Sequence, residues 1–60
     1  MAVVKANGIG KVYPKGTTYL EIARDFQDQY ENDILLVRVN GKLRELEKTL
    51  AGDSEISFIT

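Results

Sequence analysis

The stretch Ile34–Leu46, ILLVRVNGKLREL, decides the fold of this 60-residue chain. Apart from Arg38, its first six residues are apolar and partly β-branched, which is typical of a strand with neighbours on both edges. Asn40-Gly41 follows, and both residues tolerate the positive φ angles of a tight reversal. The stretch therefore predicts a central β-hairpin, and the rest of the chain must supply its cover and its neighbours.

The segment before this hairpin has the pattern of an amphipathic helix. Thr18 and Glu21 form a capping box, in which the hydroxyl and the carboxylate satisfy amide donors of the first turn. Apolar and aromatic residues then recur at helical spacing on one stripe, with charged residues opposite. The stripe consists of Tyr19, Ile22, Ala23, Phe26 and Tyr30. We expect Asn32-Asp33 to end the helix.

Two registers are open for the central hairpin. A two-residue turn places Leu43 opposite Arg38, whereas a three-residue loop over residues 39–41 places Leu43 opposite Val37. The longer loop keeps apolar residues opposite each other on the side that faces the helix. We therefore expect the three-residue loop, with Leu35, Val37 and Leu43 packed against Ile22, Ala23 and Phe26 of the helix.

Three more strands complete the predicted fold. Residues 1–6 and 11–14 read as a hairpin around a reversal at Asn7–Gly10, and residues 55–60 read as a last strand. Leu46 and Leu50 anchor the irregular connection before that strand. The order β-β-α-β-β-β predicts an α+β domain in which one helix packs on a mixed sheet. This order matches a β-grasp, or ubiquitin-like, roll, whose first and last strands run parallel in the middle of the sheet.

Length and composition limit the function classes. Sixty residues form a single domain, which we expect to span 1–60 and to be a piece of a longer protein, because Thr60 directly follows an apolar segment. The absence of Cys and His excludes disulfides and a zinc cluster. A net charge of −1 gives no global attraction to nucleic acid or membranes. No signal peptide or membrane span is visible, so we expect a cytoplasmic protein.

No catalytic constellation is present either. Gly10-Lys11 and Gly41-Lys42 both lack the hydroxyl residue and the earlier glycine of a phosphate-binding P-loop. Glu21, Asp25 and Asp28 share the outer helix face, where solvated charge is the simplest interpretation. No serine or threonine has a histidine partner that would act as a base. We expect no catalytic residue, no metal and no cofactor in this chain.

A basic cluster on the hairpin is the best candidate binding site. Arg38, Lys42 and Arg44, with Lys48 as a further member, lie on or near the hairpin and would contact RNA phosphates or a nucleotide. The alternative is ordinary solubilising charge, in which Lys42 or Arg44 pairs with Glu45 or Glu47.

A second candidate is the sheet face that points away from the helix. Leu36 and Ile59 point there if Val37 and Phe58 face the helix. An apolar pair bordered by Arg38 is a candidate docking surface for a neighbouring domain. Scattered apolar surface residues without a function are the alternative.

Several segments together resemble the TGS domain. They are YPKGTTYLEIA (13–23), VRVNGKL (37–43), Leu46 with Leu50, and GDSEISFIT (52–60). Threonyl-tRNA synthetases, certain GTPases and the stringent-response (p)ppGpp synthetases/hydrolases share this module. The resemblance implies a β-grasp fold and a regulatory or ligand-binding role, without a catalytic residue. Within that family, YENDILLVRVNGKLREL (30–46) and EISFIT (55–60) are similar to the N-terminal region of bacterial uridine-kinase-like nucleoside kinases.

The resemblance and the residues together lead to two hypotheses. The first is a noncatalytic regulatory module of a multidomain enzyme, expected to be a nucleoside kinase, that docks on downstream domains of its own polypeptide and has nucleotide or RNA as candidate ligands. The second is an RNA-binding module of a threonyl-tRNA synthetase or stringent-response enzyme, acting through the basic hairpin. A ubiquitin-like carrier is set aside, because the chain ends Phe58-Ile59-Thr60 rather than in the Gly-Gly of such carriers.

Overall fold

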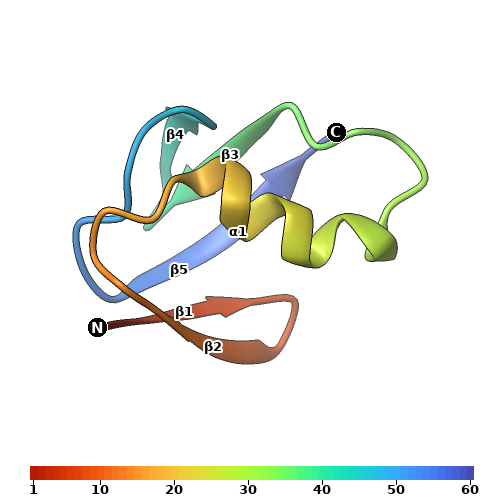
Figure 1. The fold of residues 1–60 in the computed structure, drawn as a ribbon. Coiled ribbons are helices and arrows are strands. Elements are labelled where there is room, and N and C mark those ends of the chain that lie inside the picture. Colours follow the sequence, from red (N-terminus) through yellow and green to blue (C-terminus); the bar gives the residue numbers. More distant parts are fainter.

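The computed structural model describes all residues, 1–60, as one sheet with one helix across it (Figure 1). The elements are β1 (Ala2–Ala6), β2 (Ile9–Tyr13), α1 (Tyr19–Phe26), the 3₁₀ turn η1 (Gln27–Gln29), β3 (Leu36–Val39), β4 (Lys42–Glu45) and β5 (Ser54–Ile59). This confirms the predicted α+β class and the order β-β-α-β-β-β.

The sheet has the strand order β2-β1-β5-β3-β4. β1 and β5 run parallel, and every other neighbouring pair is antiparallel. The first and last strands therefore lie together in the middle, as expected for a β-grasp roll. β3 is paired on both edges, by β5 and β4, which agrees with its nearly continuous apolar sequence.

The core lies between α1 and one face of the sheet. Alternate residues of β1 and β3 are buried there, and the predicted helical stripe covers them from above. Phe26 is at its centre and stacks on Phe58 of β5, with 5.1 Å between ring centroids. The core cluster consists of Ala2, Val4, Ala6, Tyr13, Tyr19, Ile22, Phe26, Val37, Val39, Leu50 and Ile56, with Leu46 and Phe58 packed against it.

The helix begins after Thr18 as predicted, but without the expected bond to the Glu21 carboxylate, and it ends earlier than expected. The Thr18 hydroxyl accepts a hydrogen bond from the Glu21 amide at 3.3 Å. The α-helix stops at Phe26 and tightens into η1, well before Asn32-Asp33. Gln27 then holds the following loop, since its side-chain oxygen accepts the Ile34 amide at 3.0 Å and its amide donates to the Asn32 carbonyl at 2.8 Å.

The predicted register of the β3–β4 hairpin is wrong. Val39 pairs with Lys42 and Arg38 with Leu43, so the turn has two residues, Asn40 at φ 51° and Gly41 at φ 86°. Two residues with positive φ match the right-handed twist of the flanking strands. The apolar pairing that favoured a longer loop has no effect, because all four residues of β4 are exposed and the edge strand receives no cover from the helix.

Two packing assignments fail together with that register. Leu43 is 51% exposed on the uncovered face, and Leu35 is 63% exposed. Ile34 is buried in place of Leu35, because β3 begins only at Leu36 and the bond from Gln27 fixes the chain before it. Val37 is fully buried, as predicted. Leu46 and Leu50 also pack on the core as expected.

Asn40 ties the hairpin to the central strand. Its amide donates to the Glu55 carbonyl at 2.9 Å, and its side-chain oxygen accepts the Glu55 amide at 2.9 Å. The turn thus extends the ladder between β3 and β5 beyond the last strand residue. Its second residue, Gly41, has open space where a Cβ would lie, so only its backbone conformation restricts the residue type.

We predict that Gly41→Ala lowers the free energy of unfolding by about 1 kcal/mol, because an L-residue is strained at positive φ. Gly52→Ala is the matched control, since its Cβ also meets nothing but its φ is not positive. The control should leave stability unchanged or raise it slightly. Urea denaturation monitored by circular dichroism measures both. Equal changes in the two variants would contradict the assigned turn.

Candidate functional site

The hairpin sorts the three predicted cations onto two faces of the sheet. Lys42 lies opposite Val39 and Arg44 opposite Val37, and directly paired residues of antiparallel strands project to the same face. Val37 and Val39 are core residues, so Lys42 and Arg44 lie on the helix side. Arg38 alternates with them and lies on the open face. The structure therefore brings two of the three residues together and separates the third.

Lys48 joins Lys42 and Arg44 at a hollow of about 610 Å³. We call this hollow the basic pocket. It lies between the helix-side edge of β4, the first residue of α1 and the segment that leads into β5. Its lining residues are Tyr19, Val39, Asn40, Lys42, Arg44, Lys48, Thr49, Ala51, Gly52, Asp53 and Ser54.

Backbone bonds between the start of α1 and residues 46–50 position Lys48. The Leu20 amide donates to the Leu46 carbonyl at 2.9 Å, and the Tyr19 amide donates to the Lys48 carbonyl at 3.0 Å. The Leu50 amide donates to the Thr17 carbonyl at 2.8 Å. The first amides of the helix are thereby satisfied from within the chain. An anion at the basic pocket would have to be held by side chains rather than by the helix terminus.

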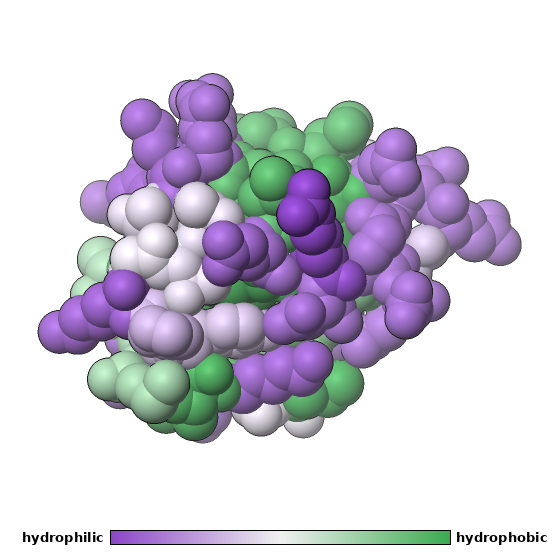
Figure 2. Space-filling model, viewed as in Figure 1, coloured by the Kyte–Doolittle hydropathy of each residue, from purple (hydrophilic) through white to green (hydrophobic).

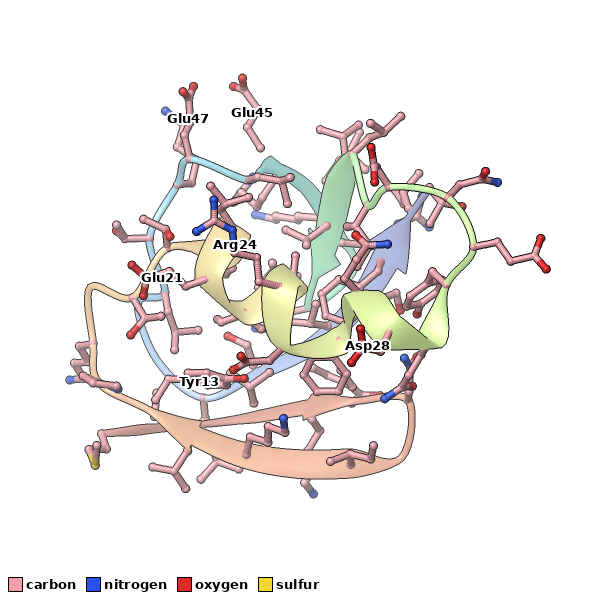
Figure 3. The ribbon with its side chains drawn as sticks, turned by 45° about the vertical axis from the view of Figure 1, so that its right-hand side comes forward. Tyr13, Glu21, Arg24, Asp28, Glu45 and Glu47 are labelled. Atoms are coloured by element: carbon pink, nitrogen blue, oxygen red, sulfur yellow. The ribbon has the colours of Figure 1, made fainter.

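The cations of the basic pocket form no hydrogen bond with a carboxylate. Arg44 donates from Nη1 to the Leu43 carbonyl at 3.2 Å, which leaves its other donors available. Glu45 and Glu47 were the predicted neutralising partners, and Figure 3 shows both side chains pointing outward from the β4 end of the molecule. Asp53 is the one carboxylate in the lining, and its Oδ1 accepts the Val3 amide at 2.8 Å.

Arg38 lies at a different and smaller hollow. It shares a space of about 380 Å³ with Asn40, Gly41, Glu55 and Ser57 on the open face. A carboxylate lines this hollow, so the local charge is balanced. Arg38 therefore belongs to the open face and borders the docking candidates, rather than contributing to the basic pocket.

The docking candidates Leu36 and Ile59 pair directly on the open face and are both half-buried. Leu43 lies next to them on β4, because it is opposite Arg38. Figure 2, viewed from the helix side, shows a mainly hydrophilic surface with a hydrophobic area where β3 begins. On the opposite face, the half-buried Leu36 and Ile59 and the exposed Leu43 form one apolar area.

Tyr19 is the lining residue that sequence reasoning missed as part of a site. Its position on the helical stripe predicts a core residue, and the ring is indeed buried. Its presence in the basic pocket depends on the path of residues 46–54, which no local pattern indicates. Asn40 is similar, because turn propensity explains its conformation but not its position at the pocket.

The carboxylates of the outer helix face form no site of their own. Glu21 and Arg24 project from α1 and Asp28 from η1, at separate positions (Figure 3). No group of three or more His, Cys, Asp or Glu residues is arranged to hold a metal ion. No helix has the length and apolar character needed to cross a membrane.

The comparisons with known proteins agree on one domain type. The family model described as the TGS domain matches residues 1–60. The threonine–tRNA ligase of Prosthecochloris aestuarii is 30% identical over 60 residues, which cover 100% of this chain and 9% of that protein. The threonine–tRNA ligase of Chloroherpeton thalassium is 33% identical over 54 residues, or 90% of this chain and 8% of that protein. The chain thus spans less than a tenth of the length of these relatives.

Asp25 joins β2 to the helix. The Tyr13 hydroxyl donates to Asp25 Oδ2 at 2.7 Å. Burial of the phenol raises the pKa of Tyr13 well above its ordinary value, and the hydrogen bond to Asp25 and the charge of that carboxylate raise it further. The neutral phenol is therefore the form that the fold requires.

We predict that Tyr13→Phe removes a tyrosine ionisation that the folded chain delays to higher pH. The folded state holds this proton more tightly than the unfolded state, whose tyrosine pKa is about 10. Tyr13 therefore contributes stability that is complete below that pH and is lost as pH rises toward its folded pKa. Absorbance of tyrosinate at 295 nm measures the titration. Tyr30→Phe is the control, and an unchanged last ionisation step in Tyr13→Phe would contradict the assignment.

Proposed function

Because this chain belongs to the TGS domain family, we propose that it is a noncatalytic RNA-binding module of a larger, cytoplasmic protein of the threonine–tRNA ligase type. The observation that carries the proposal is the basic pocket, where Lys42, Arg44 and Lys48 gather without hydrogen-bonded carboxylates. Such a cluster attracts the phosphates of RNA, and the counterions released from the RNA provide much of the free energy of binding. The rest of the surface balances these charges, so attraction is local to this edge.

The relatives favour a ligase over a kinase as the parent protein. Both are threonine–tRNA ligases, and the matched segments are 9% and 8% of their length. The similarity of residues 30–46 and 55–60 to nucleoside kinases gains no support from them. A domain of this size in a ligase would add contacts to RNA or to other domains, while the chemistry takes place elsewhere in the polypeptide.

A second role is favoured by the open face. Leu36 and Ile59 form a cross-strand pair, and Leu43 extends it on the edge strand. We propose that this apolar area docks on another domain of the same polypeptide. The two roles are compatible, because the basic pocket lies on the helix side and the docking area on the opposite face.

We predict that replacing Lys42, Arg44 and Lys48 by Ala weakens binding of a short single-stranded RNA at least tenfold. For wild type, log K should fall with log salt with a slope of about −2, as expected when three cations neutralise phosphates of a single strand. The variant should lose most of that slope. Fluorescence anisotropy over a range of salt concentrations measures both quantities.

Two controls separate this site from general charge and from the predicted hairpin cluster. Replacing Lys5, Lys15 and Arg24 by Ala removes the same charge from exposed positions outside the pocket. Arg38→Ala removes the one predicted cation that lies on the open face. Both should bind RNA like wild type. If the first control loses as much RNA affinity as the pocket variant, binding depends on net charge and not on this site.

For the docking area, we predict that Leu43→Lys in the parent protein increases amide hydrogen exchange in β3 and β4. Val12→Lys is the matched control, because Val12 is 57% exposed on the other edge strand and Leu43 is 51% exposed. In the 60-residue chain alone, the two substitutions should have equally small effects. If the parent protein exchanges these amides as fast as the isolated domain before any substitution, the open face is not an interface.

A further inference from the structure

The Tyr19 hydroxyl is the one tyrosine hydroxyl that has no hydrogen-bond partner within the chain. The other two tyrosines both use their hydroxyls within the protein, Tyr13 by donating to Asp25 at 2.7 Å and Tyr30 by donating to Asn7 at 3.1 Å. The Tyr19 hydroxyl has no such partner, although the residue is only 4% exposed. A phenylalanine would fill the same place in the core. The hydroxyl is therefore free to bond water or a ligand outside the chain.

We infer that the free hydroxyl reaches solvent at the basic pocket. No buried side-chain oxygen or nitrogen in the structure lacks a hydrogen-bond partner, so the unbonded hydroxyl of Tyr19 must reach solvent. The basic pocket is the hollow that Tyr19 lines. Packing of the ring on the core leaves this donor little freedom to move. The pocket thus combines one rigid donor with three flexible cations.

Charge balance points to a doubly charged ligand. The lining of the basic pocket contains Lys42, Arg44 and Lys48 and one carboxylate, that of Asp53, which is an excess of two positive charges within the lining. Glu45 lines a separate hollow beside Arg44 and Lys48. A phosphodiester in an RNA backbone carries one negative charge, whereas a phosphomonoester carries about 1.5 to 2 at neutral pH and has three terminal oxygens that accept hydrogen bonds. The hollow of about 610 Å³ also lies within the usual size range of small-ligand pockets.

We propose that the basic pocket binds a phosphomonoester group, with the Tyr19 hydroxyl donating to one terminal oxygen and the three cations neutralising the others. This rests on the proposed function, because the cations are the same, and it deepens that function by naming the group that enters the pocket. The group would be supplied either by the 5′-phosphate of an RNA or by a free nucleoside monophosphate. The helix amides take no part, since Leu46 and Lys48 carbonyls already occupy them.

The test compares two RNA oligonucleotides of one sequence, with a 5′-phosphate or a 5′-hydroxyl, and AMP as the free nucleotide. Calorimetry or anisotropy measures their binding to the 60-residue chain. We expect the 5′-phosphorylated RNA to bind about tenfold more tightly than the 5′-hydroxyl RNA, as an added charge-assisted contact would produce. Tyr19→Phe should reduce this preference severalfold while leaving the fold intact, because it removes only a hydroxyl that bonds nothing in the protein.

Tyr30→Phe is the matched control, since it removes a hydroxyl bound to Asn7 and outside the basic pocket. It should keep the full preference for the 5′-phosphate. Equal binding of the two RNAs would overturn the inference while leaving RNA binding intact. A full preference in Tyr19→Phe would overturn it as well. AMP binding that depends on Tyr19, without binding of either RNA, would support the pocket and remove the proposed RNA function.

Discussion

The turn at Asn40-Gly41 is the constraint on which the arrangement of the surface depends. Its two positive φ angles set a two-residue reversal, and a shift of one residue would move every side chain of β4 to the other face. Asn40 also ties the turn to β5, because it forms hydrogen bonds with both the amide and the carbonyl of Glu55. Lys42 and Arg44 reach the helix side, and Leu43 the open side, because of this register.

The segment 46–50 has the second decisive role. Leu46 and Leu50 cover the core where the helix does not reach, and the backbone between them satisfies the first amides of α1. The same segment therefore completes the core and caps the start of the helix. As a result, this segment places Lys48 near the edge of β4. Most of the residues that follow, as far as Ser54, line the basic pocket. Packing and binding chemistry therefore share the same backbone.

The sequence predicted the fold well where a local pattern and the core agree. The capping residue Thr18, the buried stripe from Tyr19 to Phe26 and the Asn-Gly reversals each depend on near neighbours, and each is present in the structure. Tyr30, the last predicted residue of the stripe, lies beyond the helix. Predictions failed at the edge of the sheet. Leu35 and Leu43 are apolar enough to suggest burial, but no element covers them, and hydrophobicity alone does not say where cover will be.

The candidate site shows the same division. Position on or near the predicted hairpin identified the basic residues as a group, and Lys42, Arg44 and Lys48 do lie together. The sequence did not predict that Arg38 lies on the other face, because this depends on the register of the strands. It also did not predict that Tyr19 lines the pocket, because this depends on contacts between the start of the helix and residues 46–50.

By itself, then, the sequence determined the element order, the helical face and the places where the chain reverses, because propensity, periodicity and positive-φ residues act over a few neighbours. Tertiary structure alone decided which face of the sheet each cation occupies and that the Tyr19 hydroxyl has no partner within the chain. Those outcomes depend on pairing between distant strands and on the path of residues 46–54. In this chain the Ile34–Leu46 stretch specifies a hairpin, and its partners decide what that hairpin presents.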